Sequence, residues 1–114
     1  MTEPARQVVT ATSTNAARSI TVTCTDAGAI TELHFEPAVY GHGARSLAAE
    51  ILRLSQRSTL LAKARRRQLL ADAGLAPVLL DRLGLPFPEA VDAQLAALED
   101  QGTPEAPRGW VRAI

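Results

Sequence analysis

The feature that most constrains the fold of this chain is the run of residues 44–73, which is predicted to form one long helix with apolar side chains on two sides. At 3.6 residues per turn, a main set of apolar positions falls on one side and a smaller set falls on roughly the opposite side. The main set comprises Leu47, Ile51, Leu54, Ser58, Leu61, Ala62 and Leu69. A helix with one apolar stripe needs one packing partner, so this helix needs two.

We expect a β-sheet against the main set and a second copy of the same helix against the smaller set. The sequence therefore predicts a homodimer whose interface is formed by Leu52, Leu60 and Leu70. Arg65 falls on the main stripe, so packing on the sheet is expected to end near Leu61 or Ala62. Beyond that point the helix is expected to project from the body and to expose its basic end.

The residues before this helix predict a three-stranded antiparallel β-meander, with strands over 7–12, 19–25 and 30–36. Strict alternation in the second strand predicts threonines on its solvent face and a buried face that carries Ile20, Val22 and Cys24. Together with the long helix, this pattern predicts an α+β fold with the sheet in the order 1-2-3.

Turn residues fix the expected connection between the second and third strands. Gly28 follows Asp26 and Ala27 and can adopt the positive φ that a hairpin turn needs. Ile30 is out of phase with Leu33 and Phe35, and a β-bulge just after the turn is expected to restore the alternation.

Capping signals fix the expected ends of the long helix. Pro37 stops the third strand, and residues 38–43 are expected to form a loop. Ser46 is the expected N-cap because no side chain over 41–44 can cap a helix well. Gly74 is the expected C-terminal cap.

Two domains are expected along the chain. Residues 1–75 form a sheet-plus-helix core, of which the first six residues are expected to be disordered. Residues 76–114 form an acidic extension with short helices over 77–83 and 88–100. Gly and Pro are frequent over 101–109, which predicts a mobile tail that ends in an apolar segment with Trp110, the single tryptophan.

The zero net charge of the chain hides two charged blocks. Residues 44–71 carry seven basic side chains and one acidic one, so 7 − 1 = +6, and residues 72–107 carry one basic and seven acidic, so 1 − 7 = −6. In one interpretation the acidic block folds back and neutralises the basic one. In the other, the basic helix binds nucleic acid through Arg53, Arg57, Lys63, Arg65, Arg66 and Arg67.

The string SITVTCTDAGAITELHFEP (19–37) followed by SLAAEILRLSQRSTLLAKA (46–64) resembles the YbaB/EbfC family of small nucleoid-associated proteins. The resemblance covers residues 7–73 and is carried by Val22, Gly28, Ile30, Leu33, Phe35, Pro37, Leu47, Ile51 and Ala64. It implies an α+β fold, dimers formed through sheet and helix, and DNA binding. The family usually begins with a long helix before the sheet, for which this chain has no room.

The segment LGLPFPEA (83–90) is similar to an element of actinobacterial Esp-type proteins that are associated with type VII secretion. Those proteins carry a YbaB-like core and an acidic N-terminal extension that is absent here. This likeness implies an accessory or chaperone-like role with a protein client.

His34, His42 and Cys24 do not form a catalytic or metal-binding pattern. The histidines are eight residues apart, with no Cys or carboxylate at metal-ligand spacing. Cys24 alternates with Val22 and is expected in the core. The Gly41-His42-Gly43 segment lacks the further glycines and the Lys of a phosphate-binding loop. We therefore expect a non-enzyme with no cofactor and no metal.

These observations predict a non-enzymatic, cytoplasmic homodimer that binds double-stranded DNA by sequence-tolerant phosphate contacts. The alternative is an accessory protein for type VII secretion that binds a protein client, rather than DNA, through exposed apolar residues. Those residues are Leu52, Leu60, Phe87 and Trp110. No segment approaches the roughly 20 apolar residues of a membrane span, so no membrane partner is expected.

Overall fold

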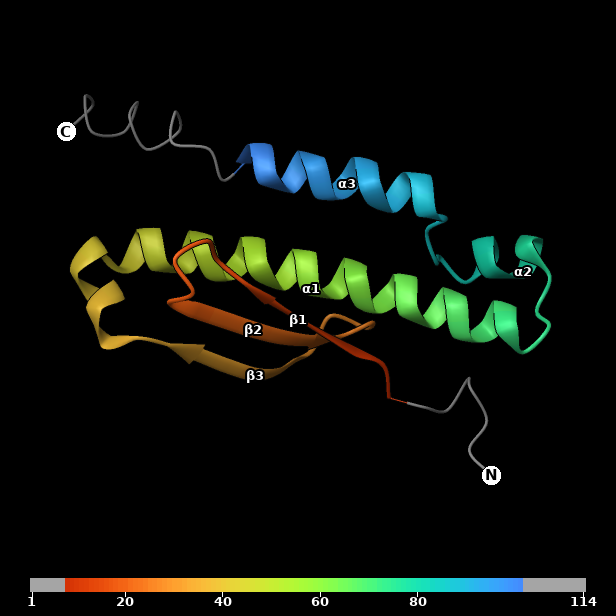
Figure 1. Ribbon diagram of the computed structural model, residues 1–114, viewed down its shortest axis with the longest axis horizontal. Coiled ribbons are helices and arrows are strands. Elements are labelled where there is room, and N and C mark those ends of the chain that lie inside the picture. Colours follow the sequence, from red (N-terminus) through yellow and green to blue (C-terminus); the bar gives the residue numbers. More distant parts are fainter. Residues whose placement is uncertain (1–7, 102–114) are drawn as a thin grey trace.

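The protein has an α+β fold in which a three-stranded antiparallel sheet packs on one long helix (Figure 1). The structure is a computed structural model that describes residues 8–101. Its elements, in chain order, are β1 (Thr10–Thr14), β2 (Ile20–Thr25), β3 (Ile30–Phe35), the 3-10 helix η2 (Pro37–His42), α1 (Ala44–Asp72), α2 (Pro77–Arg82) and α3 (Pro88–Gln101). The predicted fold class and the predicted strand order β1-β2-β3 are confirmed.

The alternation of β2 places its apolar residues in the core, as predicted. Ile20, Val22 and Cys24 are buried and form one cluster with Val39 and Leu54. The other face of β2 is not fully solvated, because Thr23 is also buried. Its hydroxyl lies 2.7 Å from the hydroxyl of Thr12 on β1, so a cross-strand hydrogen bond satisfies it.

The β2–β3 hairpin contains the expected irregularity. Gly28 has φ of 93° in the turn. The register then shifts, because Thr23 pairs with Glu32 whereas Cys24 pairs with Ile30. Thr31 is therefore the extra residue of a β-bulge, which brings Ile30 onto the same face of the sheet as Leu33.

The first strand begins and ends later than predicted. Its pairing with β2 runs from Thr10 to Thr14, whereas residues 7–12 were expected and Gln7 lies outside the described residues. The end of the strand is fixed by Asn15, whose side-chain oxygen accepts hydrogen bonds from the backbone N–H groups of Ser19 and Ile20. The β1–β2 turn therefore begins at Asn15.

Two expectations about the start of the long helix are wrong. Residues 38–43 do not form an irregular loop, because η2 occupies most of this segment and places Val39 in the core. The N-cap is Gly43 rather than Ser46. Gly43 has φ of 93°, and its carbonyl accepts the N–H of Leu47, so the helix starts without a capping side chain.

The helix α1 packs on the sheet along more of its length than predicted. Ala62 is fully buried with Val9 and Ala11, and Leu61 and Leu69 pack against this cluster. The helix therefore does not leave the sheet near Ala62. Arg65 interrupts the apolar stripe but lies at the edge of β1.

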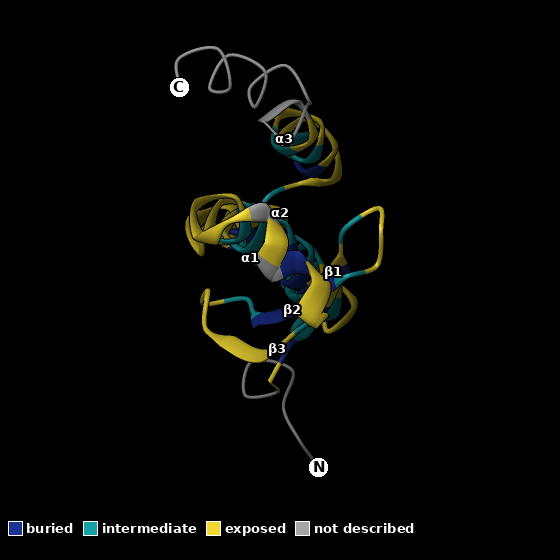
Figure 2. Ribbon diagram, turned by 90° about the vertical axis from the view of Figure 1, so that its left-hand side faces the viewer, coloured by how far each residue is buried: buried dark blue, intermediate teal, exposed yellow. Residues whose placement is uncertain are grey.

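The chain after α1 folds back over the outer side of this helix. Gly74 follows the last turn, as predicted, and Leu70 packs in a cluster with Leu80 and Leu85. α3 then runs antiparallel to α1, and Figure 2 shows the sheet, α1 and α3 as successive layers. Within residues 8–101, no helix combines the length and apolar composition needed to cross a membrane.

Candidate functional site

The basic residues of α1 make contacts with neighbouring parts of the same chain. Arg53 forms an ion pair with Glu50 one turn before it, at 2.6 Å, and Arg66 pairs with Asp26 of the β2–β3 turn. These two arginine side chains are at most 18% exposed. Their guanidinium groups are therefore held against the fold and do not extend into solvent.

Two further arginines of α1 pair with the acidic block. Arg67 Nη1 lies 2.8 Å from a carboxylate oxygen of Asp81 and also donates to the carbonyl of Leu85. Arg57 lies 3.9 Å from Glu99 on α3. These contacts agree with the interpretation that the acidic block folds back on the basic one.

The remaining two candidate residues differ in their surroundings. Arg65 Nη1 donates a hydrogen bond of 2.7 Å to the carbonyl of Thr10 on β1, although much of its side chain is exposed. Lys63 has no hydrogen bond or ion pair with any part of the chain that the structure describes. The six predicted residues therefore do not form one open basic surface.

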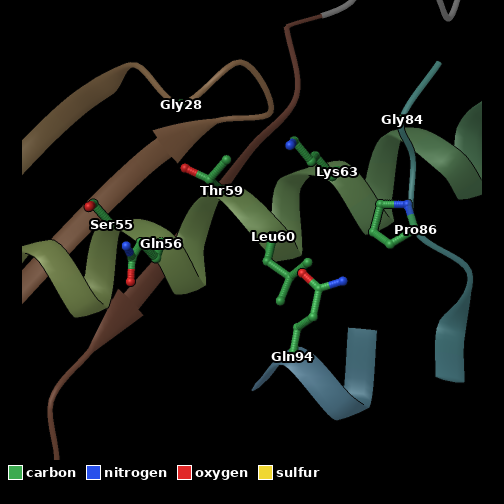
Figure 3. A pocket seen from close by; sticks show the side chains of 9 residues that line it. All are labelled: Gly28, Ser55, Gln56, Thr59, Leu60, Lys63, Gly84, Pro86 and Gln94. Atoms are coloured by element: carbon green, nitrogen blue, oxygen red, sulfur yellow. The ribbon is translucent and has the colours of Figure 1, made fainter. Parts of the chain in front are cut away.

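Lys63 lies in a shallow groove of about 370 Å³ along α1. Figure 3 shows Ser55, Thr59 and Lys63 on the side of α1 that faces Gly28 in the β2–β3 turn. Leu60 points instead toward Gln94 on α3, with Pro86 beside it. The groove combines one cation with hydroxyl and amide groups, and it holds no carboxylate among its lining residues.

The structure buries two of the three leucines of the predicted dimer interface and leaves the third exposed. Leu60 is 7% exposed and Leu70 is 6% exposed, because residues from α2 to α3 cover them. Leu52 is 58% exposed. The second apolar side of α1 is therefore largely covered by the same chain and does not by itself require a second copy.

The exposed large apolar side chains gather at two other places. One is β3, where Ile30 is 47% exposed and Leu33 is 44% exposed. The other is α2 and the residues after it, which expose four side chains, and we call these four residues the α2 patch: Val78, Leu79, Leu83 and Phe87. Val8 and Leu52 complete the set of large apolar residues that are exposed within residues 8–101.

β3 is exposed because α1 does not cover it. The register places Leu33 opposite Val22 and Ile30 opposite Cys24, so both side chains lie on the face of the sheet that α1 covers over β1 and β2. Figure 2 shows β3 as exposed and β2 as buried. Our sequence analysis identified these residues as strand positions but missed that they form a surface. The order 1-2-3 was the available signal, because it makes β3 an edge strand.

The residues considered for catalysis or metal binding lie apart. Cys24 is buried on β2, as expected. His34 is exposed on β3, with Nε2 3.8 Å from Glu36. The side chain of His42 lies outside the described residues. Over the described ranges, no group of three His, Cys, Asp or Glu side chains is placed to hold a metal ion.

Comparison of the chain with protein-family models, with curated proteins and with solved structures finds no match in any of the three. The resemblance to the YbaB/EbfC family therefore stays a prediction from the sequence.

Proposed function

We propose that this protein is a non-enzymatic protein-interaction module that acts as a homodimer joined through β3. The observation that supports the proposal is an edge strand with a half-exposed apolar face. An edge strand offers a row of backbone N–H and C=O groups that another strand can pair with. On β3 this row lies beside Ile30 and Leu33, so backbone pairing and apolar burial would occur together.

The hydrogen-bond pattern of β3 identifies the groups available for pairing. The N–H of Glu36 donates to the carbonyl of Ser19, next to the start of β2. Because alternate residues of an antiparallel strand direct their backbone groups to opposite edges, the N–H and C=O of Leu33 point away from β2. Leu33 is thus at the centre of the unpaired edge.

The sequence of β3 favours a second copy of this chain as the partner. A two-fold axis at Leu33 pairs this residue with Leu33 of the second copy and keeps both apolar faces on the same side. The same axis places Glu32 opposite His34 of the second copy, and His34 opposite Glu32. The acidic side chain therefore meets an imidazole rather than another carboxylate, which favours this register. The result is a continuous six-stranded sheet.

Sedimentation equilibrium at micromolar concentration tests this proposal. We expect a mass of twice 12.1 kDa for the native chain. Leu33→Lys should give a monomer, because two lysines would then face each other at the two-fold axis. Val78→Lys is the matched control, since Val78 is also exposed but lies on α2, and this variant should remain a dimer. A monomeric native chain, or a dimeric Leu33→Lys variant, would contradict the proposal.

A protein client is the second candidate role, and the α2 patch favours it. The patch presents four apolar side chains on a six-residue helix and the turn after it. α2 and β3 lie on opposite sides of α1 (Figure 1), so the patch would stay exposed in a dimer joined through β3. An association with type VII secretion is a proposal that rests on the similarity of residues 83–90 alone.

DNA binding has less support from the structure. The predicted contact residues Arg53, Arg57, Arg66 and Arg67 are paired with carboxylates of the same chain. A phosphate would have to displace these partners, and only Lys63 and Arg65 offer a charge that no carboxylate of the described residues holds. DNA binding therefore stays a sequence-based prediction.

A further inference from the structure

The outer side of α1 is covered over only part of its length. Leu60 and Leu70 are buried beneath the segments that follow α1. The first turns of the helix have no such layer among the described residues. Leu52 is 58% exposed there, and the neighbouring Ala48 and Ala49 are exposed as well.

The chain leaves the described structure close to this uncovered region. α3 runs antiparallel to α1 toward its first turns (Figure 1). Its last turn is placed by Glu99, which lies 3.9 Å from Arg57. Leu52 is five residues before Arg57, which corresponds to about 7.5 Å along a helix axis.

The sequence after α3 is long enough to extend to Leu52 and contains apolar residues that could cover it. Gly102, Pro104 and Pro107 disfavour continuation of the helix. Trp110 is the ninth residue after Gln101, and an extended chain of that length spans ~30 Å. The segment 110–114, WVRAI, contains Trp110, Val111 and Ile114 and is the most apolar stretch after α3.

We propose that residues 110–114 pack on the outer side of α1, with the Trp110 ring on Leu52 and on the small side chains of Ala48 and Ala49. A flat aromatic ring suits a shallow site of one leucine between alanines, because it buries a large area without needing a pocket. The contact continues the outer layer of α3 along α1. It also occupies Leu52 within one chain, so this residue does not contribute to a dimer interface. The inference is independent of the pairing through β3.

Trp110 is the single tryptophan of the chain, so its fluorescence reports on this contact directly. In the native protein we expect blue-shifted emission and weak acrylamide quenching, both independent of protein concentration. Leu52→Asp should shift the emission to the red and raise the quenching constant to that of the urea-unfolded chain. Val78→Asp, at an equally exposed position, should change neither quantity. Circular dichroism should show both variants folded, and Leu52→Gln provides a second, uncharged variant.

Three results would overturn the inference. The first is solvent-exposed emission from Trp110 in the native protein. The second is emission that Leu52→Asp and Leu52→Gln leave unchanged. The third is a blue shift that disappears on dilution or in the monomeric Leu33→Lys variant, because Trp110 would then be covered by a second copy. Retention of the blue shift in Leu33→Lys supports docking within one chain, whether or not the native protein dimerises.

Discussion

Ser58 shows how a single polar residue is accommodated on the apolar side of α1. Its side chain is fully buried among apolar residues, and its hydroxyl donates a hydrogen bond of 2.9 Å to the carbonyl of Val22 on β2. A buried hydroxyl without a partner would be costly, so this bond allows the serine to stay in the core. It also joins the middle of α1 to the central strand.

We expect Ser58→Ala to lower the free energy of unfolding by about 1 kcal/mol, because a buried hydrogen bond is lost with little change in volume. Ser55 is the matched control: it lies on the same helix, and its hydroxyl donates to the carbonyl of Leu52 at a partly exposed position. Ser55→Ala should change stability by less than about 0.5 kcal/mol. Urea unfolding followed by circular dichroism measures both, and equal effects would contradict the role given to Ser58.

At the scale of elements, periodicity predicted the bounds of β2, β3 and α1 to within one residue, but it misplaced β1 and missed η2. The alternation of Ile20, Val22 and Cys24 has a simple physical cause, since one face of β2 is buried against α1. Ile30 is out of phase with Leu33 in the sequence, and this predicted the β-bulge, because the apolar residues of β3 lie on one face of the sheet. These signals are local, so one sequence is enough to read them.

The parts that could not be predicted depend on tertiary contacts. The helical pattern showed that Leu60 and Leu70 need cover, but not that the same chain supplies it. Likewise, the charge blocks did not show which pairs would form, because Arg66 pairs with Asp26, 40 residues earlier, and Arg67 with Asp81. Our interface prediction therefore placed Leu60 and Leu70 on a surface that the structure closes. The sequence did not identify Gly43 as the N-cap, because glycine has no side chain that could accept a hydrogen bond from the first turn of the helix.

The charge pairing on α1 leads to a prediction about DNA. In a gel-shift series at low salt, we expect no shift of duplex DNA at tens of micromolar protein, because four of the arginines are held by carboxylates. A shift that weakens steeply with salt would contradict this, since each neutralised phosphate releases a counterion. Loss of that shift when Arg65, Arg66 and Arg67 are replaced together by Ala would assign it to α1 and favour the nucleoid-associated function.

At the scale of the whole molecule, the described residues bury their own core but leave the outer edge of β3 without a partner strand. The sheet, α1 and the segments after it form successive layers, which explains how Leu54 and Leu80 are both almost fully buried. Within residues 8–101, the β3 edge of the sheet combines unpaired backbone groups with the half-exposed side chains of Ile30 and Leu33. Pairing of two copies there would remove the exposed edge and extend the sheet from three strands to six.

Amide hydrogen exchange at Leu33, measured by NMR, tests this central claim most directly. The N–H of Leu33 points away from β2, so it is protected only if a second strand pairs with β3. We predict that it exchanges as slowly as the ladder N–H groups of Glu32 and His34 at concentrations where the dimer forms, and that it loses this protection on dilution or in Leu33→Lys. Fast exchange of the Leu33 amide at every concentration, with Glu32 and His34 still protected, would contradict pairing through β3.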